Sequence, residues 1–114
     1  MTVDEYRRIA LAQPEAVESS HMSHPDFRVG GKIFATIPSV TRDKGMVKLT
    51  PDQQKQFVQE YPKIFSAVPG GWGLRGATLV SLAPATKRIV NRAMRIAWRN
   101  TAPKRLTAQV DAER

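Results

Sequence analysis

Apolar and polar residues alternate with two different periods along the chain, which predicts both helices and strands. Thr2 followed three residues later by Glu5 forms a capping box, the reciprocal pair of side-chain contacts that begins many helices. Tyr6 and Ile9 then place apolar side chains at helical spacing. Pro14 disfavours helical backbone in the residue before it. We therefore expect a short amphipathic helix that begins after Thr2 and ends before Pro14.

Gly30 and Gly31 separate two segments, 26–29 and 32–37, in which apolar and polar side chains alternate. A type I′ turn requires positive φ at both central residues, and glycine adopts positive φ without steric cost. Two alternating segments joined by two glycines therefore predict a β-hairpin. The apolar face of this hairpin is expected to comprise Phe27, Val29, Ile33, Ala35 and Ile37.

The middle of the chain predicts a strand followed by a helix. A loop from Pro38 to Gly45 is expected to lead into a strand at 46–49. Thr50 is followed by a proline and, three residues later, by Gln53, which is the pattern of a second capped helix start. We expect this helix to extend over residues 51–60.

Segments 63–68 and 77–82 are expected to form a short edge strand and a longer strand, with an irregular glycine-rich loop at 69–73 between them. The longest helix is expected at 85–100, and a tail follows from 102. With 114 residues the chain has room for one domain. We therefore predict an α+β fold, a single-domain two-layer sandwich in which helices pack on one face of an antiparallel sheet.

The basic side chains are concentrated in the second half of the chain. The net charge is +8, yet residues 1–60 contain eight basic and eight acidic side chains. Between Glu60 and Asp111 there is no acidic residue. This asymmetry indicates an anionic partner, either nucleic acid, an acidic protein or an anionic membrane surface. The alternative is a surface charge that only keeps a small protein in solution.

Four arginines of the predicted last helix lie within one arc of about 60° when residues are drawn at 100° each. Like charges at helical spacing repel one another, and a row of phosphates would relieve that repulsion. The alternative is a solvated face, or arginines paired with acids of residues 1–60. The four residues are Arg88, Arg92, Arg95 and Arg99.

These features predict a non-enzymatic binding module that binds nucleic acid with little sequence preference by neutralising phosphates. The alternative function is an adaptor domain that docks on an acidic protein partner. We expect no membrane partner and a cytoplasmic location, because the sequence shows no signal peptide and no apolar run of membrane-spanning length. The candidate nucleic-acid-binding residues are Arg75, Arg88, Arg92, Arg95, Arg99, Lys104 and Arg105.

Trp72 lies among glycines and is followed by Arg75. One interpretation is a stacking surface with a phosphate contact for single-stranded nucleic acid. The other, which we favour, is that Trp72 closes the end of a small core while the glycines permit the turn. The segment is not a phosphate-binding P-loop, because no Lys-Ser or Lys-Thr pair follows it. A small-ligand pocket between the sheet and the helices near Trp72 is a weaker alternative.

Other kinds of site find little support in the sequence. The chain has no cysteine, which excludes disulfides, thiolate metal sites and cysteine nucleophiles. His21, His24 and Asp26 resemble a metal set, but zinc needs a further ligand and only Glu18 lies nearby. Ser20 and His21 are adjacent, and adjacent residues of a strand point to opposite faces. We therefore expect no enzyme activity, no metal and no cofactor.

The sequence resembles the MmcQ/YjbR family, and the resemblance extends from the first helix to about Leu106. It implies a fold similar to bacterial frataxin, with a domain over 1–106 and a C-terminal tail over 107–114. It also implies DNA binding, since the family carries that label. The segments that carry the resemblance are His24–Ala35, Gly45–Pro51, Gly71–Thr78, and Ala97–Asn100 together with Ala102–Leu106.

The resemblance does not extend to every functional feature. Iron binding of the frataxin kind needs a run of carboxylates on the first helix, whereas here two acids are balanced by two arginines. Segment 39–44 departs from the family pattern, so no function is assigned to it. Of the four arginines on the last helix, only Arg99 lies within a family segment.

Overall fold

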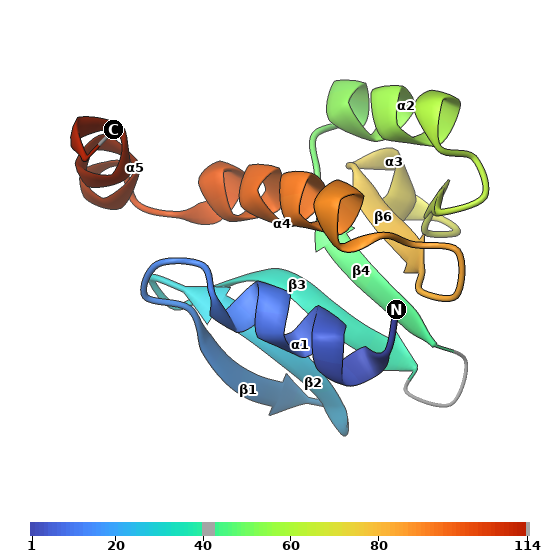
Figure 1. Cartoon of the computed structure of the whole chain (residues 1–114), viewed down its shortest axis with the longest axis horizontal. Helices are drawn as coiled ribbons and strands as arrows, with labels where there is room; N and C mark the ends of the chain where they lie inside the picture. Colours follow the sequence, from blue (N-terminus) through green and yellow to red (C-terminus); the bar gives the residue numbers. More distant parts are fainter. Residues whose placement is uncertain (40–42, 114) are drawn as a thin grey trace.

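One antiparallel sheet organises the fold (Figure 1). In the computed structural model, which describes residues 1–39 and 43–113, six strands lie in the order β1-β2-β3-β4-β6-β5. Each strand pairs antiparallel with its neighbours, which confirms the predicted α+β class. The strands are β1 (Val17–His21), β2 (His24–Val29), β3 (Lys32–Ser39), β4 (Lys44–Lys48), β5 (Phe65–Ala67) and β6 (Ala77–Ser81).

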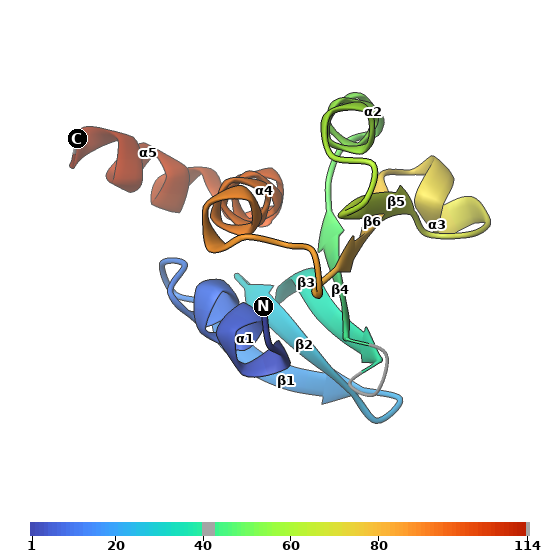
Figure 2. The ribbon, with the colours of Figure 1, turned by 45° about the vertical axis from the view of Figure 1, so that its right-hand side comes forward.

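The long helices cover one face of this sheet. Figure 1 shows α1 and α4 side by side across it, and Figure 2 shows α4 and α3 on opposite sides of β4 and β6. The predicted one-sided packing therefore holds for α1, α2 and α4, while the single turn of α3 lies on the other side. The helices are α1 (Val3–Leu11), α2 (Pro51–Glu60), α3 (Gly71–Leu74), α4 (Lys87–Thr101) and α5 (Lys104–Ala112).

The hydrophobic core lies between the sheet and the helices α1, α2 and α4. Trp98 and Tyr6 are its largest fully buried side chains. Each has a polar atom, and each polar atom has a partner. The Trp98 Nε1 donates to the Pro14 carbonyl at 2.9 Å, and the Tyr6 hydroxyl donates to the Met46 carbonyl at 2.8 Å. Burial raises the pKa of Tyr6, which keeps this donor protonated.

The predicted hairpin is confirmed, but its apolar face differs by one residue. Gly30 and Gly31 have φ of 57° and 79°, as the type I′ turn requires. A bulge shifts the register, so that Phe27 faces Ala35 whereas the next residue, Arg28, faces Ile33. Phe34, which lies between Ile33 and Ala35, is therefore buried. The predicted core residue Ile33 lies on the outer face instead.

Both predicted capping boxes are present, at Thr2 with Glu5 and at Thr50 with Gln53. The predicted loop at 38–45 is shorter than expected, because β3 reaches Ser39 and β4 begins at Lys44; residues 40–42 lie outside the described part. The structure adds three elements that the sequence analysis missed, namely β1, α3 and α5. Among the described residues, no helix combines the length and apolar character needed to span a membrane.

Candidate nucleic-acid interface

Helix α4 positions the predicted arginines on the outer surface of the molecule. The Thr86 hydroxyl begins the helix by accepting the Ile89 amide at 3.3 Å. The inward side of α4 is fully apolar and buried in the core, so the arginines must project away from the sheet. The buried residues of this side are Ile89, Val90, Ala93, Met94, Ala97 and Trp98.

Two of these arginines rest on aromatic rings of the core boundary. The Arg92 guanidinium lies 5.6 Å from the ring centre of Phe57 on α2, and that of Arg95 lies 5.5 Å from the ring of Trp98. Arg95 also donates to the Gln13 side chain. Ring contacts attract a cation without neutralising it. Both guanidinium groups are therefore oriented while they keep their charge.

Arg88 occupies the amino-terminal end of the same face. Its side chain is exposed, and among the described residues it has no ion-pair or hydrogen-bond partner. Asp52 and Glu60, the acids of α2, also form no ion pair with α4 among the described residues. The face at Arg88, Arg92 and Arg95 is therefore cationic without a compensating carboxylate in the described chain.

Two further candidate cations are neutralised. Arg99 forms a bidentate pair with Asp111 on α5, with N–O distances of 3.0 and 3.1 Å. These hydrogen bonds raise the pKa of Arg99. Arg105 pairs with Glu15 at 3.3 Å, and this contact likewise raises its pKa. Among the described residues, the alternative that the four α4 arginines pair with acids of residues 1–60 holds for none of them, because the partner of Arg99 comes from the last helix. Arg105, which is not one of the four, does pair with such an acid.

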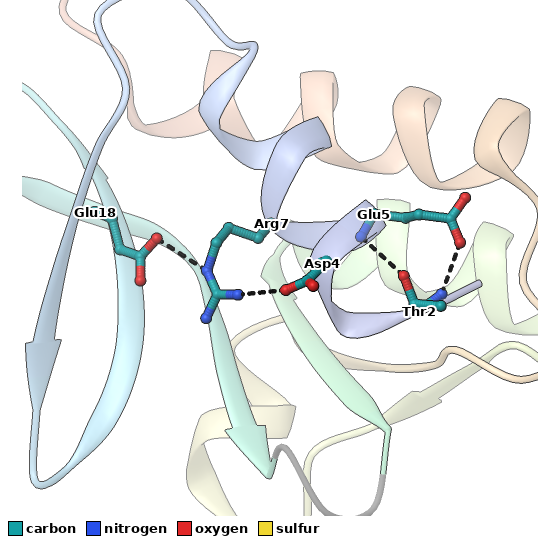
Figure 3. A network of polar contacts seen from close by, with 5 residues as sticks. All are labelled: Thr2, Asp4, Glu5, Arg7 and Glu18. Carbon is teal, nitrogen blue, oxygen red and sulfur yellow. Dashed lines mark hydrogen bonds and ion pairs between the residues drawn. The ribbon is translucent and has the colours of Figure 1, made fainter.

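The acidic side chains near the amino terminus form ion pairs with residues other than the α4 arginines. Figure 3 shows Arg7 between Asp4 and Glu18, with distances of 2.9 and 3.1 Å to their carboxylates. Glu5 accepts the Thr2 amide and pairs with Lys87 at 3.0 Å. The backbone hydrogen bond first, and Lys87 second, lower the pKa of Glu5 to about 2. These contacts explain why the acids of α1 do not reach the arginines of α4.

The prediction that Trp72 closes the core is wrong. Trp72 is 64% exposed on α3, and the Arg75 guanidinium lies 5.8 Å from its ring centre. The buried residue of this turn is Gly73, where a Cβ atom would lie 1.6 Å from the Val68 carbonyl oxygen. Because only glycine fits against Val68, its neighbour Trp72 is directed outward. The Gln54 side chain on α2 fixes the turn by donating to the Gly73 carbonyl at 3.0 Å.

The structure therefore gathers only part of the predicted set. Arg88, Arg92, Arg95 and Arg99 share α4, and Lys104 and Arg105 follow at the start of α5, where Lys104 is exposed. Arg75 directly follows α3 and stacks on Trp72 instead. The contacts of Arg92 with Phe57 and of Arg95 with Gln13 join residues distant in sequence, so helical spacing alone could not indicate them; Trp98, by contrast, lies three residues after Arg95 on the same helix.

The residues that resemble a metal set come together only in part. His21 and Asp26 come together, with 2.8 Å between the imidazole Nδ1 and a carboxylate oxygen, but Glu18 turns to Arg7. Asp26 is also bound by Arg28 at 2.8 and 3.1 Å. Arg28 first, and His21 second, hold the pKa of Asp26 below its usual range. Among the described residues, no group of three or more potential ligands could hold a metal ion.

Comparisons with known proteins agree with this architecture. The chain is similar to a protein of Deinococcus radiodurans, DR2400, whose crystal structure contains the family-model domain DUF419. The two share 18% sequence identity with a TM-score of 0.70, over 85% of this chain and 75% of that one. At this identity the likeness concerns the fold alone. No curated protein matches the chain.

The family model is more specific than the structural likeness. The model of the YjbR family matches residues 11–100, which include the hairpin, the sheet and nearly all of α4. The matched range contains four segments that carry the resemblance described above, and it ends before α5. These segments are His24–Ala35, Gly45–Pro51, Gly71–Thr78 and Ala97–Asn100. The chain therefore belongs to the YjbR family.

Proposed function

We propose that this protein is a binding module that binds nucleic acid with little sequence preference through the outer face of α4. The observation that supports the proposal is the environment of three arginine side chains on this face, Arg88, Arg92 and Arg95. They have no carboxylate partner among the described residues, and ring contacts hold two of them in place. A side chain that is already oriented loses less conformational freedom on binding.

The chemistry of this face suits phosphate groups. A guanidinium presents forked N–H donors that match phosphate oxygens, and it keeps its charge at all physiological pH values. From Arg88 to Arg99 the helix axis covers roughly 16 Å at 1.5 Å per residue. Contacts to phosphates carry no base information, so binding of this kind has little sequence preference.

Arg99 and Arg105 can contribute to phosphate binding only if their ion pairs open. A phosphate that contacts Arg99 or Arg105 must compete with Asp111 or Glu15 for the guanidinium. The exposed Lys104 carries no such competitor among the described residues. Arg88, Arg92 and Arg95 therefore form the centre of the proposed interface, and Lys104 extends it.

The test compares two triple variants with the same net charge. Fluorescence anisotropy would follow labelled duplex and single-stranded DNA of unrelated sequences at several salt concentrations. We expect R88Q/R92Q/R95Q to weaken binding and to reduce the salt slope by up to about 3, since each phosphate contact contributes about 0.9. The control K32Q/K55Q/K63Q removes three exposed lysines elsewhere and should change the slope much less.

Two outcomes would contradict the proposal. Equal losses in the two triple variants would show that total charge, rather than the α4 face, controls binding. Absence of parent binding even at low salt would exclude nucleic acid, and the acidic protein partner would become the leading interpretation of the same face.

A further inference from the structure

A second site lies on the sheet face opposite α4. The side chains of Thr36, Met46 and Leu79 come from three adjacent strands and stand next to one another, because Thr36 pairs with Met46 and Met46 with Leu79. Their strand neighbours, such as Val47 and Val80, point into the core. The three side chains form the floor of a pocket of about 470 Å³.

The walls of this pocket are mainly apolar. Trp72 on α3 and Val68 border one side of the floor, and Ile33 and Pro38 border the other. The bulge in β3 places Ile33 here rather than in the core. Pockets of about 300–1,000 Å³ with apolar walls and few polar groups are typical small-molecule sites. An exposed tryptophan at the wall also offers a ring face for stacking.

The polar groups at the rim favour an anion. Lys48 lies beside Ala77 at one end of the floor, and among the described residues it has no ion-pair partner. Two neighbouring hollows also include Lys48, and they add Arg28 and Arg75. Among the described residues that line the pocket and these two hollows, none is a carboxylate. Among the described residues, Lys48 and Arg75 therefore have no carboxylate partner, whereas Arg28 is paired with the buried Asp26.

His21 supplies a second fixed polar group. Its Nδ1 lies 2.8 Å from the Asp26 carboxylate, whose other oxygen is bound by Arg28. Asp26 is fully buried, so its carboxylate forms a rigid support for the imidazole. His21 itself lines the pocket. A polar group held in this way is oriented before a ligand arrives.

We propose that this pocket binds a small carboxylate with a flat aromatic body. The ring system would lie on Met46 and Leu79 against the Trp72 wall, and the carboxylate would pair with Lys48. Charge-assisted hydrogen bonds contribute about 1.5–3 kcal/mol, which corresponds to a tenfold or greater change in affinity. The site is separate from the α4 face and does not depend on the proposed nucleic-acid binding.

The experiment uses three ligands of the same shape and different charge. Isothermal titration calorimetry on the full chain would compare 2-naphthoate, the neutral 2-naphthamide and the cationic 2-naphthylmethylammonium. We expect 2-naphthoate to bind at least tenfold more tightly than the cation. Chemical-shift mapping by NMR should place the changes on β4, β6 and α3. K48M should weaken 2-naphthoate roughly tenfold and leave 2-naphthamide unchanged.

Two further variants keep the test decisive. K48E should lose 2-naphthoate and gain affinity for the cation, which mere loss of folding would not produce. K55M removes an exposed lysine of α2 and should leave all three ligands unaffected. Equal binding of the three ligands, no saturation by 2-naphthoate at millimolar concentration, or shift changes confined to α4 would each overturn the proposal.

Discussion

Asp111 holds Arg99 in a bidentate ion pair that joins α5 to the carboxyl-terminal end of α4, with distances of 3.0 and 3.1 Å. The pair lies at one end of the basic face of α4. On the rest of this face, Arg88, Arg92 and Arg95 have no carboxylate partner among the described residues. Both side chains are partly exposed, so the contact is open to competition from solvent and from anions. Asp111 is thus a local competitor for any phosphate that approaches Arg99.

Removing this competitor should strengthen DNA binding. We expect D111N to lower the dissociation constant several-fold and to steepen the salt dependence by up to about 1, because Arg99 then becomes available to a phosphate. The melting temperature should change little, since exposed ion pairs contribute little to stability. Fluorescence anisotropy and thermal unfolding would measure both effects. E113Q makes the same change in charge at the residue that follows α5, and an equal gain there would attribute the effect to net charge alone.

Leu106 tests whether α5 is part of the folded core. The residue is 2% exposed and belongs to the central hydrophobic cluster, although it lies in a segment that the sequence pattern assigned to a tail. We expect L106A to destabilise the protein by about 2–4 kcal/mol through lost burial and the cavity left behind. Urea unfolding would measure this. V110A, at a partly buried position of the same helix, should cost clearly less. A neutral L106A would show that α5 does not pack stably on the core.

Local sequence signals account for most of the elements that were predicted. Both capping boxes specify helix starts within one turn, and two adjacent glycines specify the hairpin turn, because these features depend only on residues a few positions apart. Strand β1 was missed because its five residues, Val17–His21, are all exposed and carry no apolar alternation. Its position follows from pairing with β2 across a turn at Met22 and Ser23, which has positive φ at both residues but contains no glycine to indicate it.

The parts of the candidate sites that the sequence could not predict depend on long-range packing. The helical arc placed Arg92 and Arg95 on one face correctly, yet it could not show that Phe57 and Gln13 would hold them. The position of Trp72 was misjudged because the close approach of Gly73 to Val68 decides which residue of the turn is buried. A single bulge likewise exchanged Ile33 for Phe34 in the core, and periodicity cannot show a bulge.

Gly45 is the glycine whose replacement should be most informative. A Cβ atom there would lie 2.4 Å from the Tyr6 ring. Tyr6 is fully buried, and its hydroxyl donates a hydrogen bond to the Met46 carbonyl of β4. We expect G45A to destabilise the fold by about 1–3 kcal/mol, since a packed core yields little to added volume. G71A is the matched control, because nothing lies within 4 Å of the added methyl group and its backbone conformation is ordinary. Chemical unfolding should show G71A near or slightly above the parent.

Asp26 should make stability depend on pH. Arg28 and then His21 hold its pKa below the usual value in the folded state. A group whose pKa is depressed by folding contributes stability above its unfolded pKa, about 3.9, and loses that contribution as the pH falls through the folded value. The unfolding free energy of the parent should therefore fall as the pH is lowered from about 5 to 2. D26N should be less stable at pH 7 by about 1–3 kcal/mol, because a buried charged acceptor is lost.

The pH profile, rather than the loss at pH 7, identifies the cause. Because the asparagine cannot titrate, the difference between the parent and D26N should be largest at neutral pH and should shrink below pH 4. Urea unfolding at six pH values would measure it, and E60Q, an exposed carboxylate of α2, provides a control whose difference from the parent should stay small throughout. If the unfolding free energy of D26N is lower than that of the parent by the same amount at pH 2.5 and at pH 7, then Asp26 stabilises the fold through its packing and not through its charge.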